Sequence, residues 1–253
     1  MKQQHFAKKH LGQNFLQSTE IRDDIVKAAE GVAGKNILEI GPGLGFLTEA
    51  ILKEKPEKLI AVEFDERAVE VLNTKFTQDK GFELIHGDFL AQNLDEIWGD
   101  QEWQIIANIP YNITNPILKK ICAQTKNKPQ SAILMIQKEV AEKIVNQKKR
   151  SILSISVEIF AEAAYLFTVD RKHFIPSPKV DSAVIKLKMR PSPLVSPELE
   201  KTFFSIINRG FARKRKKLKN NLPPEILGNI DGDRRAENLE IEDWVEMAKN
   251  AVT

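Results

Sequence analysis

The stretch NILEIGPGLGFLTEA (residues 36–50) decides the fold class. Its first five residues form a short, mostly apolar run of the kind found in buried strands, and residues 45–54 have the apolar spacing of a helix. Between them, Gly41, Gly43 and Gly45 allow a sharp turn that a ligand can approach closely, next to the free N–H groups of the following helix. A strand, a glycine turn and a helix in this order predict the first unit of an α/β fold.

The same strand-then-helix order repeats along the chain. The apolar runs are nearly continuous, which is typical of parallel strands covered on both faces. Two later strands, 164–169 and 182–189, predict an antiparallel edge, after a helix over 151–163. The pattern therefore predicts a Rossmann-like, doubly wound α/β sheet. The intervening strands are predicted at 58–64, 82–86, 103–108 and 131–137, and the helices at 65–77, 114–123 and 138–147.

The length and composition bound the rest of the chain. Its 253 residues suffice for one large α/β domain and a small appendage. The stretch PSPLVSP (191–197) is a plausible linker, so we predict a catalytic domain over 1–190 and a helical domain over 191–253. A single cysteine and the lack of Cys/His spacing favour a reducing compartment and no metal. No signal peptide or membrane span is evident, so we expect a cytoplasmic protein. The oligomeric state stays open, with a monomer as the default expectation.

Charge is unevenly distributed behind a net charge of only +3. Residues 209–219, RGFARKRKKLK, hold seven Lys and Arg side chains and no acid, whereas residues 225–246 are mostly acidic. The basic segment is either a solvated helix face or a surface that contacts nucleic-acid phosphates. The candidate RNA-binding residues are Arg209, Arg213, Lys214, Arg215, Lys216, Lys217 and Lys219.

The spacing of the glycine turn narrows the class of ligand. No Gly-Lys-Ser/Thr follows the turn, so it is not a P-loop. Phe46 stands where a dinucleotide-binding turn has its third glycine. The GxGxG spacing of Gly41, Gly43 and Gly45 is instead associated with S-adenosylmethionine (SAM).

Acidic residues follow the next two strands. Glu63 can accept hydrogen bonds from both hydroxyls of a ribose, although a solvated carboxylate is the alternative. Asp88 can accept from an adenine amino group, with Phe89 or Leu90 packing on the ring. Because parallel strands end at one edge of the sheet, these residues and Gly41 together predict a nucleoside site.

The fourth strand ends in Asn108-Ile109-Pro110-Tyr111. The amino nitrogen of an adenine is a poor nucleophile until both of its N–H bonds donate to fixed acceptors. The Asn108 side-chain oxygen and the Ile109 carbonyl can be those acceptors, and Pro110 fixes the local backbone. Tyr111 offers a face on which a flipped base can stack. The alternative is that these residues merely close a turn, but their position favours methyl transfer, which requires positioning more than a strong base.

Several segments together resemble the small-subunit ribosomal RNA adenine dimethyltransferase family. The resemblance implies a SAM-dependent enzyme that puts two methyl groups on each of two adjacent adenosines near the 3′ end of 16S rRNA, during ribosome assembly. It covers residues 5 to 222, and the segments are LGQNFL (11–16), EIGPGLGFLT (39–48), GDFL (87–90), NIPYNI (108–113), FIPSPKVDSAV (174–184) and RKRKKLKNNL (213–222).

The resemblance also implies roles for residues outside the strand ends. Asn14 and Leu16 would line the SAM site beside Gly41, Glu63, Asp88 and Asn108. Phe174 would sandwich the target base opposite Tyr111. Residues 147–156 match the family only loosely, and the last thirty residues match no motif.

Two other functions are weighed against this one. A large-subunit adenine methyltransferase of the macrolide-resistance type shares the QNF, glycine and NIPY motifs, but segments 174–184 and 213–222 argue against it. A ribosome-assembly factor that acts mainly by binding is the alternative from another class. The intact Asn108 and Tyr111 argue that catalysis is retained.

Overall fold

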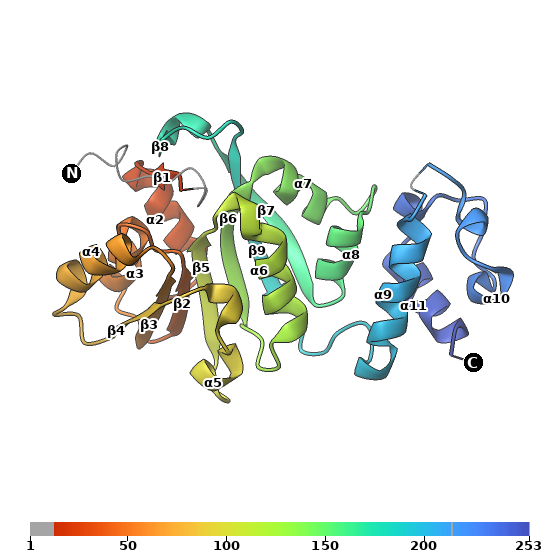
Figure 1. The fold of residues 1–253 in the computed structure, drawn as a ribbon, viewed down its shortest axis with the longest axis horizontal. Coiled ribbons are helices and arrows are strands. Elements are labelled where there is room, and N and C mark those ends of the chain that lie inside the picture. Colours follow the sequence, from red (N-terminus) through yellow and green to blue (C-terminus); the bar gives the residue numbers. More distant parts are fainter. Residues whose placement is uncertain (1–12, 214, 253) are drawn as a thin grey trace. The chain divides into compact units, whose positions relative to one another are not determined.

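The computed structural model describes residues 13–213 and 215–252 of the chain. These residues form two compact units, residues 13–141 with 164–189, and residues 142–163 with 190–252 (Figure 1). The last segment of the second unit begins at Arg190, one residue before the start of the predicted helical domain. Residues 142–163, which we expected in the first domain, group with the second unit.

A seven-stranded sheet is the centre of the fold, with the strand order β4-β3-β2-β5-β6-β9-β7. Neighbouring strands from β4 to β6 are parallel, and β9 runs antiparallel to β6. The predicted α/β sheet with an antiparallel edge is therefore confirmed. The strands are β2 (Asn36–Ile40), β3 (Lys58–Glu63), β4 (Phe82–His86), β5 (Trp103–Asn108), β6 (Ser131–Gln137), β7 (Ala161–Val169) and β9 (Ser182–Met189).

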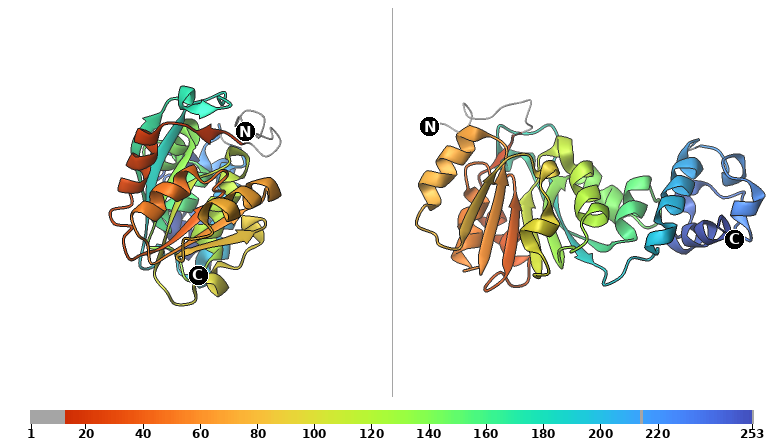
Figure 2. Two further views of the ribbon diagram at one scale, coloured as in Figure 1. Left: turned by 90° about the vertical axis from the view of Figure 1, so that its left-hand side faces the viewer. Right: turned by 60° about the horizontal axis from the view of Figure 1, so that its bottom comes forward.

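Helices connect the parallel strands, as the strand-helix alternation predicts. Figure 1 shows α3 and α4 beside strands β2 to β4, and α6 in front of β6 and β9. Figure 2 shows the strands side by side in one twisted sheet. The helices of this part of the chain are α2 (Thr19–Lys27), α3 (Phe46–Lys53), α4 (Glu66–Phe76), α5 (Leu94–Trp98), α6 (Thr114–Lys119) and α7 (Lys138–Val145).

The predicted helix over 151–163 is wrong in its second half. Helix α8 (Ile152–Glu158) begins at the capping residue Ser151, and β7 already starts at Ala161. The sequence AEAAYLFTV places alternate residues toward and away from solvent, and this period of two fits a strand rather than a helix. The change of period after Glu158 was the signal that the prediction overlooked.

The strand order reverses between β2 and β5, and this reversal positions the site. Both strands are buried on both faces, so their carboxyl ends are held rigidly by the core. From β2 the next strand along the chain, β3, is added on one side of the sheet. From β5 the next strand, β6, is added on the opposite side. Ligands of open α/β sheets bind in the crevice that forms at such a reversal. Gly41 follows β2 and Asn108 ends β5, so both lie at this crevice.

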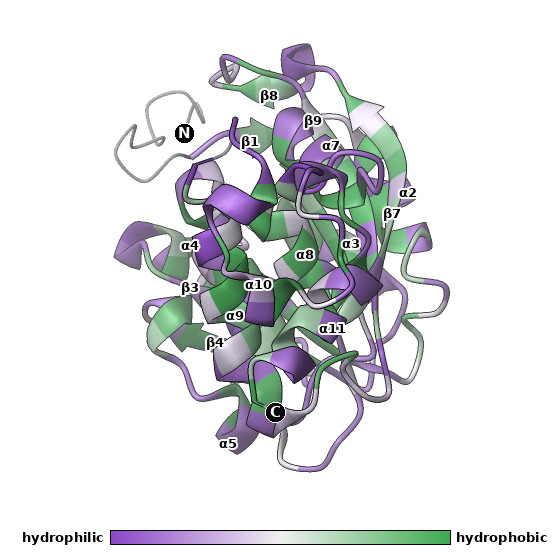
Figure 3. Ribbon diagram, turned by 90° about the vertical axis from the view of Figure 1, so that its right-hand side faces the viewer, coloured by the Kyte–Doolittle hydropathy of each residue, from purple (hydrophilic) through white to green (hydrophobic). Residues whose placement is uncertain are grey.

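The second unit is mainly helical, with α8, α9 (Pro197–Phe211), α10 (Pro224–Leu227) and α11 (Ile241–Asn250). Hydrophobic and hydrophilic residues alternate along α9 and α11, as expected for amphipathic helices (Figure 3). The rings of Phe211 and Trp244 stack with centroids 5.6 Å apart. Gly210 permits this close packing, because a Cβ there would lie 2.6 Å from the Trp244 ring.

Arg150 joins the divergent segment 147–156 to the acidic C-terminal region. Its guanidinium is almost fully buried and donates to both carboxylate oxygens of Glu158, at 3.0 and 3.1 Å. It also donates to Glu240 at 2.6 Å and to the carbonyls of Gln147 and Leu239. A buried charge must be paired in this way to be tolerated. The segment therefore has a structural role within the second unit.

Candidate active site

The glycine turn between β2 and α3 forms one wall of the site. Gly43 has a φ of 58° and Gly45 a φ of 78°, in the left-handed region that glycine adopts without strain. A Cβ on Gly43 would lie 3.0 Å from the Phe15 ring, and one on Gly45 would lie 2.5 Å from the Phe76 ring. The turn therefore needs glycine for its backbone conformation and for its close contacts.

Glu63, at the end of β3, ties the glycine turn to the next loop. Its side chain is 6% exposed and accepts hydrogen bonds from the Gly43 N–H at 2.9 Å and the Asp65 N–H at 2.8 Å. Burial raises the pKa of Glu63, and these backbone N–H groups oppose the rise. A carboxylate has about four lone-pair positions, so Glu63 can still accept from a ligand.

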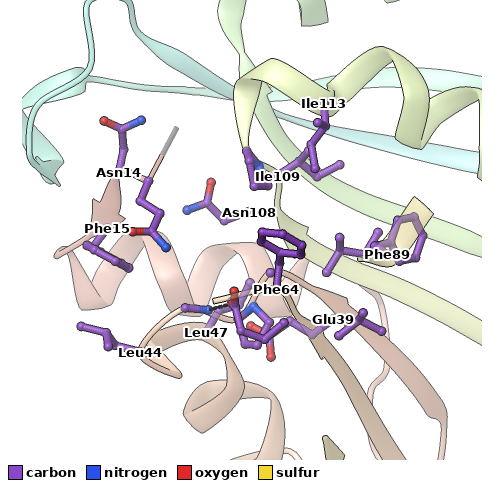
Figure 4. Close-up of a pocket in the computed structure, with 18 of the residues that line it drawn as sticks. Asn14, Phe15, Glu39, Leu44, Leu47, Phe64, Phe89, Asn108, Ile109 and Ile113 are labelled. Atoms are coloured by element: carbon purple, nitrogen blue, oxygen red, sulfur yellow. Dashed lines mark hydrogen bonds between the residues drawn. The ribbon is translucent and has the colours of Figure 1, made fainter. Parts of the chain in front are cut away.

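Phe64 lies between Glu63 and Asp65, and its ring is 61% exposed. Both neighbours are held inward, because the Asp65 N–H binds Glu63 and the Asp65 carboxylate accepts from Arg67 at 2.6 Å. The loop therefore presents a large apolar ring to the cavity, shown at the centre of Figure 4. The sequence analysis missed this residue, although an aromatic side chain directly after a ribose-binding acid was a usable signal.

Asp88 and Phe89 follow β4 at the same edge of the sheet. The Asp88 carboxylate caps a short turn by accepting from the Leu90 N–H at 2.9 Å, and its side chain is exposed. Phe89 also lines the cavity but is 4% exposed, so it offers little of its ring surface to a ligand. Phe64 consequently presents far more aromatic surface than the predicted Phe89.

The N-terminal segment closes the opposite side of the cavity. Asn14 and Leu16 both line it, as the family resemblance implies. Gln13 donates to the Asp65 carboxylate at 3.0 Å, and β1 (Phe15–Leu16) pairs with β8 (Phe174–Ile175). In Figure 4, Asn14 and Phe15 lie across the cavity from Phe89. Strands of two residues carry too little periodic pattern to be recognised from sequence.

These walls enclose a cavity of about 280 Å³. It collects the predicted residues from four separate strand ends and from the N-terminal segment. A cavity lined largely by apolar side chains with a few converging polar groups is typical of a small-molecule site. Its predicted lining residues are Asn14, Leu16, Gly41, Gly43, Glu63, Asp88, Phe89, Asn108, Ile109, Pro110 and Tyr111.

Asn108 and Ile109 line this cavity at the end of β5. The Ile109 N–H donates to the Met135 carbonyl at 3.0 Å, which fixes the backbone at the end of β5. Within the described residues, the Asn108 carboxamide makes no hydrogen bond to the protein, although it is only partly exposed. Its oxygen is therefore available to accept a hydrogen bond from a bound ligand.

The Tyr111 ring is held in place by Ser182 at the start of β9. The two hydroxyl oxygens lie 2.5 Å apart. Burial raises the pKa of Tyr111, so the phenol stays protonated at neutral pH. Ser182 is itself buried, and its position in the FIPSPKVDSAV segment explains one function of that segment. Sequence reasoning missed Ser182, because only the fold brings β9 next to the residues that follow β5.

Phe174 does not line the cavity in the structure. Its side chain is 2% exposed and packs in the core with Leu16, Ile25 and Met135. The pairing of Phe174 with Leu16 across β1 and β8 directs the ring inward. Stacking of Phe174 on a base, as the resemblance implies, would thus require the β1–β8 pair to separate.

Glu39 is a further cavity residue for which the sequence analysis assigned no role. Its side chain is 1% exposed and accepts a hydrogen bond from the Thr48 hydroxyl at 2.7 Å. Burial raises the pKa of Glu39 to about 8, with a smaller contribution from the nearby charge of Glu63. At neutral pH, Glu39 is therefore mostly protonated.

Replacing Glu39 with glutamine should remove one component of the pH dependence of stability. The folded protein keeps the Glu39 proton up to about pH 8, whereas the unfolded chain releases it near the usual 4.5. Stability should therefore fall as the pH rises through this window, by on the order of 3 kcal/mol. Urea unfolding between pH 5 and 8.5 should show a weaker fall for Glu39→Gln. Glu54→Gln, which replaces an exposed glutamate, is the control and should behave like wild type. An equal fall in wild type and Glu39→Gln would contradict the raised pKa of Glu39.

The basic segment lies in the second unit and is not one helix. Helix α9 ends at Phe211 and contains Arg209, whereas Lys219 lies in a separate 3-10 turn (Leu218–Asn220), so the expectation of one basic helix is wrong for the described residues beyond Phe211. Arg213, Arg215 and Lys216 are exposed, and Lys214 lies outside the described residues. Lys217 and Lys219 are exposed as well and form ion pairs with Asp233.

Among residues 13–213 and 215–252, no group of three or more His, Cys, Asp or Glu side chains is placed to hold a metal ion. The same portion of the chain contains no helix that is both long and apolar enough to cross a membrane.

A doubly wound sheet with this cavity at its reversal point places the chain in the class of Rossmann-like α/β proteins. The family model described as "Ribosomal RNA adenine dimethylase" matches residues 4–252. The chain therefore belongs to the ribosomal RNA adenine dimethylase family.

Curated relatives share this family relationship. The chain is 37% identical over 265 residues to "Ribosomal RNA small subunit methyltransferase A" of Bacillus pumilus, covering 95% of this chain and 90% of the relative. The protein of the same name from Dehalococcoides mccartyi is 36% identical, with 95% and 87% covered.

Solved structures share the fold. A dimethyladenosine transferase from Plasmodium falciparum matches with a TM-score of 0.79 and 25% identity, over 92% of this chain and 95% of that one. The 23S rRNA methyltransferase ErmE matches with a TM-score of 0.76 over 95% of this chain and all of that one, at 23% identity. The likeness to ErmE shows the common fold alone.

Proposed function

We propose that this protein is a SAM-dependent methyltransferase that converts two adjacent adenosines near the 3′ end of 16S rRNA to N6,N6-dimethyladenosine, within the small ribosomal subunit or its precursor. The observation that carries the proposal is the placement of Asn108 to Tyr111 in the cavity of a chain that belongs to this family. We expect the enzyme to act in the cytoplasm as a monomer.

The residues at the strand ends fit a nucleoside cofactor. In the proposal, the free acceptor positions of Glu63 bind the ribose hydroxyls, and Asp88 accepts from the adenine amino group. Phe64 covers one face of the adenine. Asn14 and the backbone of the glycine turn bind the methionine end, where the N–H groups at the start of α3 attract a carboxylate.

Removing the Phe64 ring should weaken cofactor binding more than it changes stability. The ring is 61% exposed, so Phe64→Ala should alter the unfolding free energy little. SAM affinity should fall about tenfold, because an aromatic stacking contact contributes about 1 kcal/mol and the ring also shields apolar surface from water. Calorimetric titration would measure this change, with Leu166→Ala on β7 as a control that loses an exposed apolar side chain elsewhere. Equal SAM affinity in wild type and Phe64→Ala would remove Phe64 from the site.

The NIPY residues position the adenosine. When bound, SAM supplies an electrophilic methyl group on a sulfonium sulfur. The Asn108 side-chain oxygen and the Ile109 carbonyl accept the two hydrogens of N6, which directs the nitrogen lone pair toward that methyl group. Tyr111, held by Ser182, provides a fixed face for the flipped base. The Asn108 and Ile109 oxygens would hold N6 for transfer of that methyl group, and N6 would release one proton to solvent.

The second methyl transfer places a further demand on these residues. After the first transfer N6 retains one hydrogen, so Asn108 and Ile109 can no longer both accept from it. The site must tolerate the loss of one hydrogen bond and accommodate a methyl group. We therefore expect the monomethylated adenosine to be held by a single hydrogen bond and by the Tyr111 face.

Labelled methyl transfer to two substrates tests the proposal against its alternatives. The substrates are purified small subunits that lack the modification, and large-subunit RNA. The proposal predicts incorporation into the small subunits alone. Incorporation into large-subunit RNA alone would support the macrolide-resistance activity. Binding to small subunits without incorporation, by protein that still binds SAM, would support the assembly-factor alternative.

A further inference from the structure

Two lysines of the basic segment converge on one carboxylate oxygen. The ammonium nitrogens of Lys217 and Lys219 lie 3.0 and 2.7 Å from Oδ1 of Asp233. All three side chains are about half exposed, so RNA can reach this cluster from solvent. The intervening Leu218 is fully buried and anchors the two lysines to the core of the second unit.

The backbone holds Asp233 against the lysines. The Leu218 N–H donates to the Arg234 carbonyl at 2.9 Å, and the Lys219 N–H donates to the Gly232 carbonyl at 3.0 Å. Gly232 allows this approach, since a Cβ there would lie 3.0 Å from Cβ of Lys219. These bonds fix the two segments side by side, so the contact is part of the fold.

Asp233 and the two lysines interact electrostatically. Hydrogen bonds from Lys219 and then Lys217 lower the pKa of Asp233, and Asp233 in turn raises the pKa of Lys219. The carboxylate is therefore ionised at neutral pH and partly neutralises both lysines. Among the cations of the described basic segment, Arg213, Arg215 and Lys216 show no such partner.

We propose that Lys217 and Lys219 form a phosphate site for the RNA substrate, and that Asp233 occupies this site until an RNA phosphate displaces it. The inference rests on the proposed function, which makes RNA the substrate. A phosphate oxygen can accept from two ammonium groups as the carboxylate oxygen does, and lysines bind phosphate as point charges. A phosphate diester also carries a full negative charge, so it can replace the carboxylate without leaving the lysines unpaired.

Occupation by Asp233 has a consequence for RNA selection. A single phosphate that binds the lysines must first separate two ion pairs, so isolated contacts gain little. An RNA surface that also contacts Arg213, Arg215 and Lys216 gains several contacts at once and can displace the carboxylate. Short or poorly matched RNA should therefore bind this site more weakly than it would bind two lysines without Asp233 beside them.

The test measures how tightly the full-length protein binds a 16S rRNA hairpin as the salt concentration is varied. Asp233→Asn keeps the side-chain shape and removes the charge, so the hairpin should bind about three- to tenfold more tightly at about 0.1 M salt. Glu242→Gln is the matched control, because it removes one exposed negative charge of the same unit that forms no ion pair with Lys217 or Lys219. Glu242→Gln should change the affinity by less than about twofold.

A double-mutant cycle identifies the contact that is responsible. Lys217→Gln with Lys219→Gln should weaken binding and lower the slope of log affinity against log salt by about 1, because the two lysines contact one phosphate. Asp233→Asn added to this pair should have no further effect. If Asp233→Asn strengthens binding equally in both backgrounds, or leaves it unchanged in wild type, displacement of Asp233 is excluded.

Nuclear magnetic resonance provides a second measurement that needs no variant. The Asp233 carboxyl pKa should be low in the free protein and should rise when the hairpin binds, since the lysines then pair with phosphate. An unchanged pKa in the complex would overturn the proposal. The affinity and pKa measurements need no methyl transfer, so their results do not depend on the proposed enzymatic activity. If the protein did not methylate small subunits but gave the expected hairpin results, the proposed enzymatic activity would be rejected. The phosphate site would then still stand.

Discussion

Asn108→Ala is expected to reduce methyl transfer to the small-subunit substrate by about 10²- to 10³-fold while cofactor and RNA binding are retained. The side chain lines the cavity at the end of β5, and its oxygen is one of the two acceptors proposed for adenine N6. Alanine removes that acceptor, so the nitrogen lone pair is no longer directed toward the methyl group. Single-turnover rates and SAM titration on the same preparation separate chemistry from binding.

Asn115→Ala provides the matched control for Asn108. Asn115 is an exposed residue of α6 and is not among the residues that line the cavity. Its substitution should leave the transfer rate near that of wild type. Loss of SAM binding in Asn108→Ala would indicate a structural role, and an unchanged transfer rate would remove Asn108 from the mechanism.

Glu63→Gln is expected to lower SAM affinity by about 30-fold, equivalent to about 2 kcal/mol. The two carboxylate oxygens accept from the Gly43 and Asp65 N–H groups and are proposed to bind the ribose. A glutamine side chain keeps one acceptor oxygen, but its amide nitrogen would face one of these N–H donors. The variant therefore loses a ribose contact and disturbs the turn that shapes the cavity.

Glu66→Gln is the control for this effect, because Glu66 is an exposed carboxylate in the first turn of α4. Calorimetric titration should separate the two variants clearly, with Glu66→Gln close to wild type. Thermal unfolding without cofactor should accompany it, since Glu63 also has a structural contact with Gly43. Similar SAM affinities for Glu63→Gln and wild type would show that the ribose binds elsewhere.

The sequence predicts the core of this fold because local and global signals agree there. The run 36–40 is mostly apolar, the glycines allow the sharp turn that follows it, and the next helix has an amphipathic period. Asn108 and Glu63 could be placed at one edge, since parallel strands deliver their carboxyl ends together. Family resemblance then supplied the positions of Asn14 and Leu16 at the cavity.

The residues that sequence reasoning missed depend on contacts between distant segments. Ser182 holds Tyr111 across 71 residues of sequence, and Asp233 meets Lys217 across 16. Neither contact leaves a local periodic pattern. Glu39 is adjacent to the recognised glycine turn, but its raised pKa arises from complete burial, which requires the three-dimensional packing.

Phe174 shows the limit of transferring a role by motif. The motif places an aromatic residue before a proline-rich turn, but the ring orientation depends on the pairing of β8 with β1. In the structure the ring packs in the core, whereas Tyr111 lines the cavity. The position of Phe174 in a substrate complex would show whether the short strands separate.

The most direct test of the central claim is nucleoside analysis of small-subunit RNA after reaction with the purified protein and SAM. Mass spectrometry of the digested RNA identifies the modified base, and mapping of the 3′ region locates it. The account predicts N6,N6-dimethyladenosine at two adjacent adenosines in that region, and its absence when Asn108→Ala replaces wild type. Methylation of a different base or atom, or an undiminished product from Asn108→Ala, would contradict the account.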